Sequence, residues 1–318
     1  QSWQNKKRLN GKWYSDTMHF TEPSILRQDK AAQVFTNAKG YDEFIPILKE
    51  STCSDGLVQL INDVGVPDQL VVDGARAQGS HETYNTSWRS VLRSNQIHQT
   101  FIQPHCWWQN AAERTIAELR KEMRRLQSKK HSPPRLWGFL GQYVAGKRQR
   151  TASSIPSNQG RTPFEVVHGY TPDISLYAVH DWYDFVWWYD QLDKTPKLGR
   201  WLGPAHRTFG GGDCFYVITK TGRVHVTNSI SYLKPDDWKN RDVVCQMGAI
   251  DAEINRLLGN SEHSDQDGAT MEVLPDPVGV DPDEELELEP AEPEAMMPDA
   301  DDYDPEEYDN YIGTEVLL

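Results

Sequence analysis

The chain has 318 residues, a formal net charge of −14 and four cysteines (Cys53, Cys106, Cys214 and Cys245) that form no CxxC pair. This cysteine pattern argues against a zinc finger or a disulfide framework, and the chain has no apolar run of the length that a membrane span or a signal peptide needs. We therefore expect an intracellular protein with no membrane partner.

Charge is distributed unevenly along the chain. No Lys or Arg follows Arg256, whereas 21 of the 47 acidic residues lie between Glu262 and Glu315. Residues 1–256 therefore hold the other 26 acidic residues and all 33 basic ones, a net charge of +7. A basic body of this kind suits a polyanion-binding domain, and an acidic tail repels polyanions. Ordinary solvated surface is the alternative interpretation of the basic body.

Strand-like and helical segments alternate in the first half of the chain. We expect strands at 12–20, 32–37, 43–49, 70–73 and 98–102. We expect helices at 54–64, about 81–94, about 108–129 and about 133–144. This order predicts an α/β sheet with helices on both faces.

The second half has a different character. Aromatic strand-like segments at 182–188, 214–218 and 224–227, with a turn at Lys220-Thr221-Gly222, predict a small β-barrel. Its tryptophans form either the barrel core or a platform on which bases stack. A short helical segment at 239–258 follows, and the Pro-, Asp- and Glu-rich residues 259–318 predict a disordered acidic tail.

Three carboxylates stand out at the ends of predicted elements. Asp16 and Asp73 each end a strand, 57 positions apart, and Glu113 lies 40 positions further on, near the start of a helix. Carboxylates from two strands and a helix are what a site for two divalent cations requires, because hard cations prefer oxygen ligands. The alternatives are surface carboxylates that cap strand and helix ends, and Glu118 in place of Glu113.

The helix after Trp108 is basic on its polar side. Its apolar stripe, Ala112, Ile116, Leu119, Met123 and Leu126, keeps the spacing of one buried face. At about 100° per residue, Glu113, Arg120 and Arg124 share a flank of that stripe. We expect Arg114, Arg120, Lys121 and Arg124 to contact phosphates, with a plain solvated face as the alternative.

Gln109 and Asn110 either cap the helix or touch DNA, or do both. Lys147, Arg148 and Arg150 form a further basic cluster, which either binds DNA, serves as a nuclear signal or is merely solvated.

Four motifs in order resemble the integrases of copia-type LTR retrotransposons, over roughly residues 10–235. They are Tyr14-Ser15-Asp16, Val72-Asp73-Gly74, Gln109-Asn110-Ala111-Ala112-Glu113-Arg114 and Thr162-Pro163-Phe164-Glu165 with the following Gly169. The resemblance implies an RNase H-like mixed sheet flanked by helices, with Asp16, Asp73 and Glu113 as the catalytic triad. It also implies two Mg²⁺ or Mn²⁺ ions per site and the joining of element DNA ends to target DNA.

On this reading the chain divides into an N-terminal extension (1–10), a catalytic core (11–155), a connecting segment (156–179), a β-barrel-like domain (180–238), a helical segment (239–258) and the tail (259–318). Because the first residue is Gln1 rather than Met, we expect a fragment of a Pol polyprotein. The family further implies DNA and other Pol parts as partners, self-association, and location in the nucleus and in cytoplasmic particles.

Two other functions stay open. A catalytically inactive, nucleic-acid-binding remnant of such an integrase is favoured by Asn110, which stands where the family's Asn-Gly-x-x-Glu pattern has glycine, and by the absence of an acidic residue shortly after Asp73. A hydrolytic nuclease on the same fold is disfavoured by the segment at 162–173 and the β unit that follows it.

Overall fold

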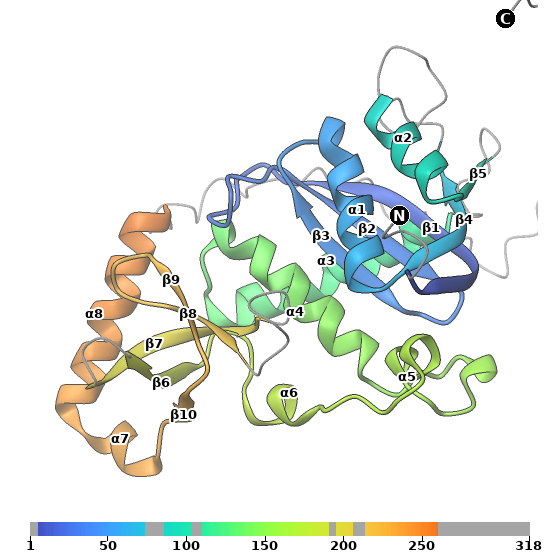
Figure 1. Ribbon diagram of the computed structural model, residues 1–318. Helices are drawn as coiled ribbons and strands as arrows, with labels where there is room; N and C mark the ends of the chain where they lie inside the picture. The colour runs from blue at the N-terminus through green and yellow to red at the C-terminus, as the bar shows by residue number, and fades with distance from the viewer. Residues whose placement is uncertain (1–5, 74–85, 103–109, 191–194, 206–213, 260–318) are drawn as a thin grey trace, which may run out of the picture. The chain divides into compact units, whose positions relative to one another are not determined.

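The first sheet is mixed and has five strands. The computed structural model describes residues 6–73, 86–102, 110–190, 195–205 and 214–259. In chain order the strands are β1 (Arg8–His19), β2 (Ala31–Asn37), β3 (Asp42–Ile47), β4 (Val66–Val72) and β5 (His98–Phe101), and their order in the sheet is β3-β2-β1-β4-β5 (Figure 1). β1, β2 and β3 are antiparallel neighbours, while β4 is parallel to both β1 and β5. This topology is RNase H-like, as predicted.

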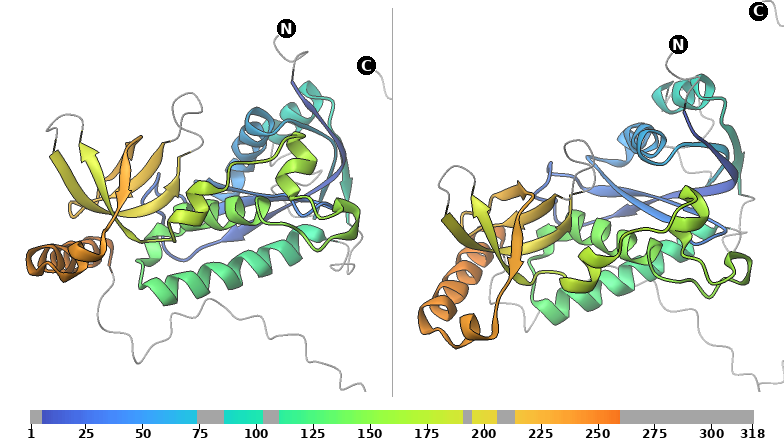
Figure 2. Two further views of the ribbon diagram at one scale, coloured as in Figure 1. Left: turned by 90° about the horizontal axis from the view of Figure 1, so that it is seen from below. Right: turned by 60° about the horizontal axis from the view of Figure 1, so that its bottom comes forward.

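Helices flank this sheet on both faces, which also confirms the prediction. They are α1 (Cys53–Asp63), α2 (Thr86–Ser94), α3 (Ala111–Lys130) and α4 (Trp137–Gln149), the last preceded by a short 3-10 helix at Pro134–Leu136. Residues of α1 and α2 share one apolar cluster with one face of the sheet, and residues of α3 and α4 share another cluster with the opposite face. Figure 2 shows α3 and α4 side by side along that second face.

Alternation along β1 sets which side chains reach which helices. Trp13 belongs to the cluster under α1, and Met18 belongs to the cluster under α3 and α4. Because successive strand residues point to opposite faces, Ser15 and Thr17 lie on the side of α1, and Asp16 lies on the side of α3. Strand β1 therefore aims Asp16 at the helix that carries Glu113.

The second sheet is antiparallel and also has five strands. The strands are β6 (Phe185–Asp190), β7 (Thr195–Pro204), β8 (Phe215–Ile218), β9 (Val224–Thr227) and β10 (Ile230–Tyr232), in the order β10-β6-β7-β8-β9. Two short helices, α5 (Pro163–His168) and α6 (Ser175–Val179), precede this sheet, and α7 (Pro235–Lys239) and α8 (Arg241–Leu258) follow it. Between residues 180 and 238, Trp182, Trp188 and Trp201 are buried, which agrees with the core interpretation, whereas Trp187 is half-buried and Trp238 is 56% exposed.

The sequence patterns missed β7 and β10. Strand β7 contains prolines and glycines, which weaken a strand prediction. At Gly199 a Cβ would lie 2.5 Å from the Val217 side chain, so the close packing of β7 against β8 requires glycine there. The predicted tail, apart from Gly259, lies outside the described residues. Within the part of the chain described, no helix has the length and apolar character needed to cross a membrane.

Candidate active site

Asp16 and Asp73 occupy adjacent positions on neighbouring strands. The parallel register of β1 and β4 pairs Ser15 with Val72, each one residue before an aspartate. Paired strands lie about 4.8 Å apart. Val72 belongs to the apolar cluster on the side of α1, so the alternation that turns Asp16 toward α3 turns Asp73 the same way. Asp16 is half-buried, and Asp73, just beyond the end of β4, is exposed.

Glu113 approaches the same side of the sheet from the first turn of α3, which packs on β1 and β2. The helix begins at Ala111 because Asn110 caps it, with the Asn110 Oδ1 accepting a hydrogen bond of 3.0 Å from the Ala112 N–H. Asn110 is buried at 5% exposure, so the capping interpretation of this residue is confirmed. Gln109 lies outside the described residues. A carboxylate such as Glu113 is favoured near a helix N-terminus by the helix dipole.

The electrostatics of Asp16 link the three carboxylates. The pKa of Asp16 is raised to about 6, first of all by burial and then by the negative charges of Asp73 and Glu113. A hydrogen bond from the backbone of Thr17 and the charge of His19 act in the opposite direction. Asp73 and Glu113 are therefore both close enough to Asp16 to raise its pKa.

The donor chemistry of this site fits a hard divalent cation, because a cluster of carboxylates in a partly buried place is relieved by a positive charge. The carboxylates of this site do not, however, form a cluster with the geometry of metal ligands. Among the residues that the structure describes, no three His, Cys, Asp or Glu side chains are grouped closely enough to hold a metal ion. The site is thus a set of neighbouring, mutually repelling carboxylates.

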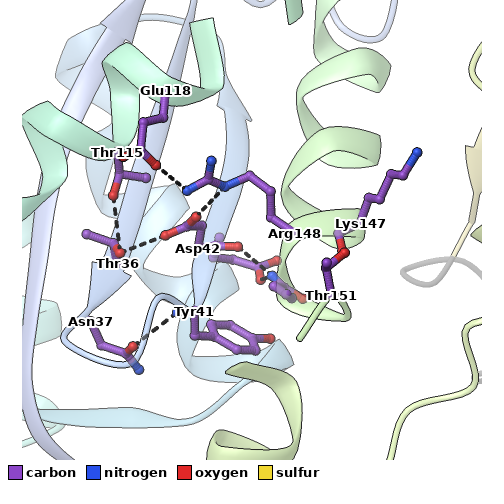
Figure 3. A network of polar contacts seen from close by, with 11 residues as sticks. Thr36, Asn37, Tyr41, Asp42, Thr115, Glu118, Lys147, Arg148 and Thr151 are labelled. Atoms are coloured by element: carbon purple, nitrogen blue, oxygen red, sulfur yellow. Dashed lines mark hydrogen bonds and ion pairs between the residues drawn. The ribbon is translucent and has the colours of Figure 1, made fainter. Parts of the chain in front are cut away.

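Glu118, the alternative to Glu113, is engaged elsewhere (Figure 3). Its Oε2 accepts a hydrogen bond of 2.6 Å from Arg148 Nη2, and Arg148 Nε donates to Asp42 Oδ2 at 2.9 Å. Asp42 is 1% exposed and also accepts from the Thr36 hydroxyl at 2.7 Å. This ion-paired network joins β3, α3 and α4, and it favours Glu113 as the third carboxylate.

Each cation of the basic cluster at the end of α4 has a partner within the fold. Arg148 belongs to the network with Asp42. The Arg150 guanidinium lies 4.7 Å from the ring centre of Phe164 and 5.4 Å from that of Tyr177. Lys147 Nζ lies 3.8 Å from an Asp181 oxygen. These contacts favour a role in packing over the predicted nuclear signal or DNA contact.

The cations of α3 divide between two faces. Arg120 and Arg124 share the face of Glu113, and burial followed by the charge of Arg124 lowers the pKa of Arg120. Arg120 Nε is buried and has no hydrogen-bond partner among the residues described. Arg125, by contrast, donates two hydrogen bonds, of 2.8 and 2.6 Å, to the carboxylate of Glu122.

Arg114 and Lys121 are on another side of the helix. They line a groove of about 880 Å³ between α3, the turn from β2 to β3, and the chain that follows α4. Glu118 and Arg148 of the ion-paired network line the same groove. The predicted phosphate-contacting residues of α3 therefore fall on two surfaces rather than one.

The segment that resembles the family after the core is a capped helix. In α5 the Thr162 Oγ1 accepts from the Glu165 N–H at 3.1 Å, and Glu165 Oε2 accepts from the Thr162 N–H at 2.8 Å. Gly169 ends the helix with φ 83°. The Thr-Pro-x-Glu motif thus has a structural explanation as a capping box.

Comparisons with known proteins found similar chains among solved structures. No protein-family model matches the chain, and no curated protein does. The chain is similar to a protein of the simian T-cell lymphotropic virus intasome in complex with PP2A regulatory subunit B56 gamma, with 14% identity, a TM-score of 0.42, and coverage of 71% of this chain and 80% of that one. It is also similar to the HTLV-2 integrase catalytic core domain in complex with magnesium (17%, TM-score 0.38, 50% and 97% covered) and to the BIV integrase catalytic core domain (16%, TM-score 0.35, 50% and 93% covered). Since identity is this low, the roles of residues rest on their placement in this chain.

Proposed function

We propose that the protein is an integrase-type polynucleotidyl transferase that joins DNA ends to target DNA. The observation that supports the proposal is that Asp16, Asp73 and Glu113 lie on one side of the mixed sheet, where burial and then the charges of Asp73 and Glu113 raise the pKa of Asp16. A packed fold gathers like charges in this way at a cost in stability, which a catalytic or binding role explains.

The three carboxylates would hold two Mg²⁺ or Mn²⁺ ions. When bound, these ions supply charge stabilisation at the attacking and leaving oxygens of an in-line phosphoryl transfer. Two observations support this: the residues before Asp16 and Asp73 are paired in the sheet, and Glu113 lies in the first turn of α3. The protein thus contributes geometry, with no covalent intermediate required of its own side chains.

DNA would lie along α3. Arg120 and Arg124 extend from Glu113 along the same face of the helix and would contact phosphate oxygens there. Arg114 and Lys121 add a second basic surface, and Gln109 and Asn110 precede the helix. We further propose membership of the copia-type retrotransposon integrases within a Pol polyprotein, assembly into homo-oligomers and action in the nucleus.

The test is a joining assay with Mn²⁺ and labelled DNA duplexes whose terminal sequences are randomised. We expect joined products from the wild-type protein and a loss of about a hundredfold or more for Asp73→Asn. The matched control is Asp68→Asn, because Asp68 lies on the same strand but makes a surface ion pair with Arg8 at 2.8 Å. Joining that survives in Asp73→Asn would refute the assignment of the site.

An inactive, nucleic-acid-binding remnant is the second candidate. The absence of a ligating group of three His, Cys, Asp or Glu among the described residues favours it. A wild-type protein that binds DNA but neither binds Mn²⁺ nor yields joined products would establish this alternative.

A further inference from the structure

A buried glutamine lies directly across the sheet from the candidate active site. Gln33 of β2 is 0% exposed, and a Cβ placed on Gly56 of α1 would lie 3.0 Å from the Gln33 Cβ. The Gln33 side chain therefore occupies the side of the sheet that α1 covers. It makes two hydrogen bonds there. Its Nε2 donates to Ser15 Oγ at 2.5 Å, and its Oε1 accepts from the Thr17 hydroxyl at 3.0 Å.

These two partners flank Asp16 in β1. One of them also contacts the Asp16 carboxylate, because the Thr17 backbone N–H donates to Asp16 Oδ1 at 2.7 Å. Gln33 holds the side chain of Thr17 on one face of the sheet, and Thr17 holds the carboxylate of Asp16 on the other. Ser15 makes the same kind of hydrogen bond to Gln33, but among the residues described no hydrogen bond joins it to the Asp16 carboxylate.

The network also favours one strand register. Thr17 pairs with Gln33 in the antiparallel ladder of β1 and β2. A slip of one residue would turn every side chain of β1 to the opposite face and leave a buried amide and two hydroxyl groups unpaired. The polar contacts on the α1 side thereby penalise any register in which Asp16 faces away from α3.

We propose that Gln33 and Thr17 are positioning residues that hold the Asp16 carboxylate in place for binding a divalent cation. This inference rests on the proposed function. Neither residue stands out in the sequence, because Gln33 interrupts an apolar strand without any motif around it. The hydrogen-bond partners of a metal-binding carboxylate orient it, and their loss weakens metal binding.

Four variants separate positioning from general stabilisation. Gln33→Met and Thr17→Val remove the hydrogen bond between Gln33 and the Thr17 side chain with little change in side-chain volume, and both keep the Thr17 backbone N–H that contacts Asp16. Thr17→Ser keeps the hydroxyl group, and Ser15→Ala removes a hydrogen bond of the same network that does not reach Asp16. Mn²⁺ binding to each full-length protein is measured by isothermal titration calorimetry, beside its thermal melting temperature.

We expect Gln33→Met and Thr17→Val to weaken Mn²⁺ binding about tenfold, and Thr17→Ser to bind like the wild type. Ser15→Ala lowers the melting temperature about as much as Thr17→Val but leaves Mn²⁺ affinity unchanged. Joining in Thr17→Val returns toward the wild-type rate at saturating Mn²⁺.

Unchanged Mn²⁺ affinity in Thr17→Val overturns the inference, and so does an affinity that follows the melting temperature in all four variants. If Gln33→Met fails to fold, the Thr17 pair decides the question alone. A wild-type protein that binds Mn²⁺ and joins DNA while Thr17→Val matches it refutes the positioning role only. A wild-type protein that binds no Mn²⁺ refutes the proposed function together with this inference.

Discussion

At the scale of a single residue, the ionisation of Asp16 is opposed by its surroundings in the site. It is half-buried, and both its burial and the charges of Asp73 and Glu113 oppose its ionisation. Because the pKa rises from 3.8 to about 6, the folded protein holds the Asp16 proton more tightly than the unfolded chain does. The ionised carboxylate, which a cation needs, is therefore the form that destabilises the fold.

The pH dependence of stability follows from this sign. As pH rises from about 4 to about 6, the contribution of Asp16 to stability is lost. In metal-free solution near neutral pH we expect Asp16→Asn to be more stable than the wild type by on the order of 2 kcal/mol, and the difference to vanish near pH 4. Urea denaturation at both pH values measures this, with Asp68→Asn as the control.

Millimolar Mg²⁺ should raise the stability of the wild type but not that of Asp16→Asn. Equal stabilisation of both proteins by Mg²⁺ contradicts a metal role for Asp16.

At the scale of one element, the arginines of α3 differ in whether they have a hydrogen-bond partner within the fold. Its apolar stripe is buried as the spacing predicts, with Leu119 at 0% and Ala112 at 0% exposure. Around that stripe, Arg125 is held by Glu122, whereas the Arg120 Nε has no partner among the residues described. The surroundings of a basic helix thus separate Arg125, which is ion-paired with Glu122, from Arg120, whose buried Nε is left unpaired by the residues described.

We expect this division to appear in the salt dependence of DNA binding. The slope of log K against log salt concentration becomes shallower by about one for each phosphate that the protein no longer neutralises. Arg120→Ala should therefore reduce the slope by about one, and Arg125→Ala should keep the wild-type slope. Fluorescence anisotropy with a labelled duplex over a range of NaCl concentrations measures both. Equal slopes for the two variants would show that the face carrying Glu113 does not contact DNA.

At the scale of the whole molecule, the negative net charge is the sum of a positively charged part and a negatively charged part of the chain. Residues 1–256 carry a net charge of +7, and the 21 acidic residues from Glu262 to Glu315 reverse it to −14. An acidic tail tethered to a basic surface competes with DNA for that surface, and the competition weakens as salt screens it.

Removal of residues 260–318 should therefore strengthen binding to a duplex by about threefold to tenfold at low salt, with a smaller gain at physiological ionic strength. The control exchanges the tail for a Gly/Ser linker of equal length, which keeps the chain length but removes the charge. If both proteins bind DNA as the full chain does, the tail does not compete for the DNA-binding surface.

The sequence by itself determined the local elements and the three candidate carboxylates. Alternating and helical spacing is set by neighbouring residues, so β1, β4 and α3 and their positions relative to Asp16, Asp73 and Glu113 were predictable. Strand β7 escaped prediction because its glycines and prolines serve contacts with β8 that the local pattern does not contain.

Only the tertiary structure decided which polar residues have partners. In the sequence Arg148 belongs to a basic cluster, and only the structure places it beside Asp42, 106 positions away. In the same way, Gln33 looks like an ordinary strand residue in the sequence, and only the structure shows its hydrogen bonds with Ser15 and Thr17. The physical reason is that hydrogen bonds and ion pairs depend on the distance between atoms of remote segments. That distance is set by how the sheet and helices pack, and no local spacing of residues records it.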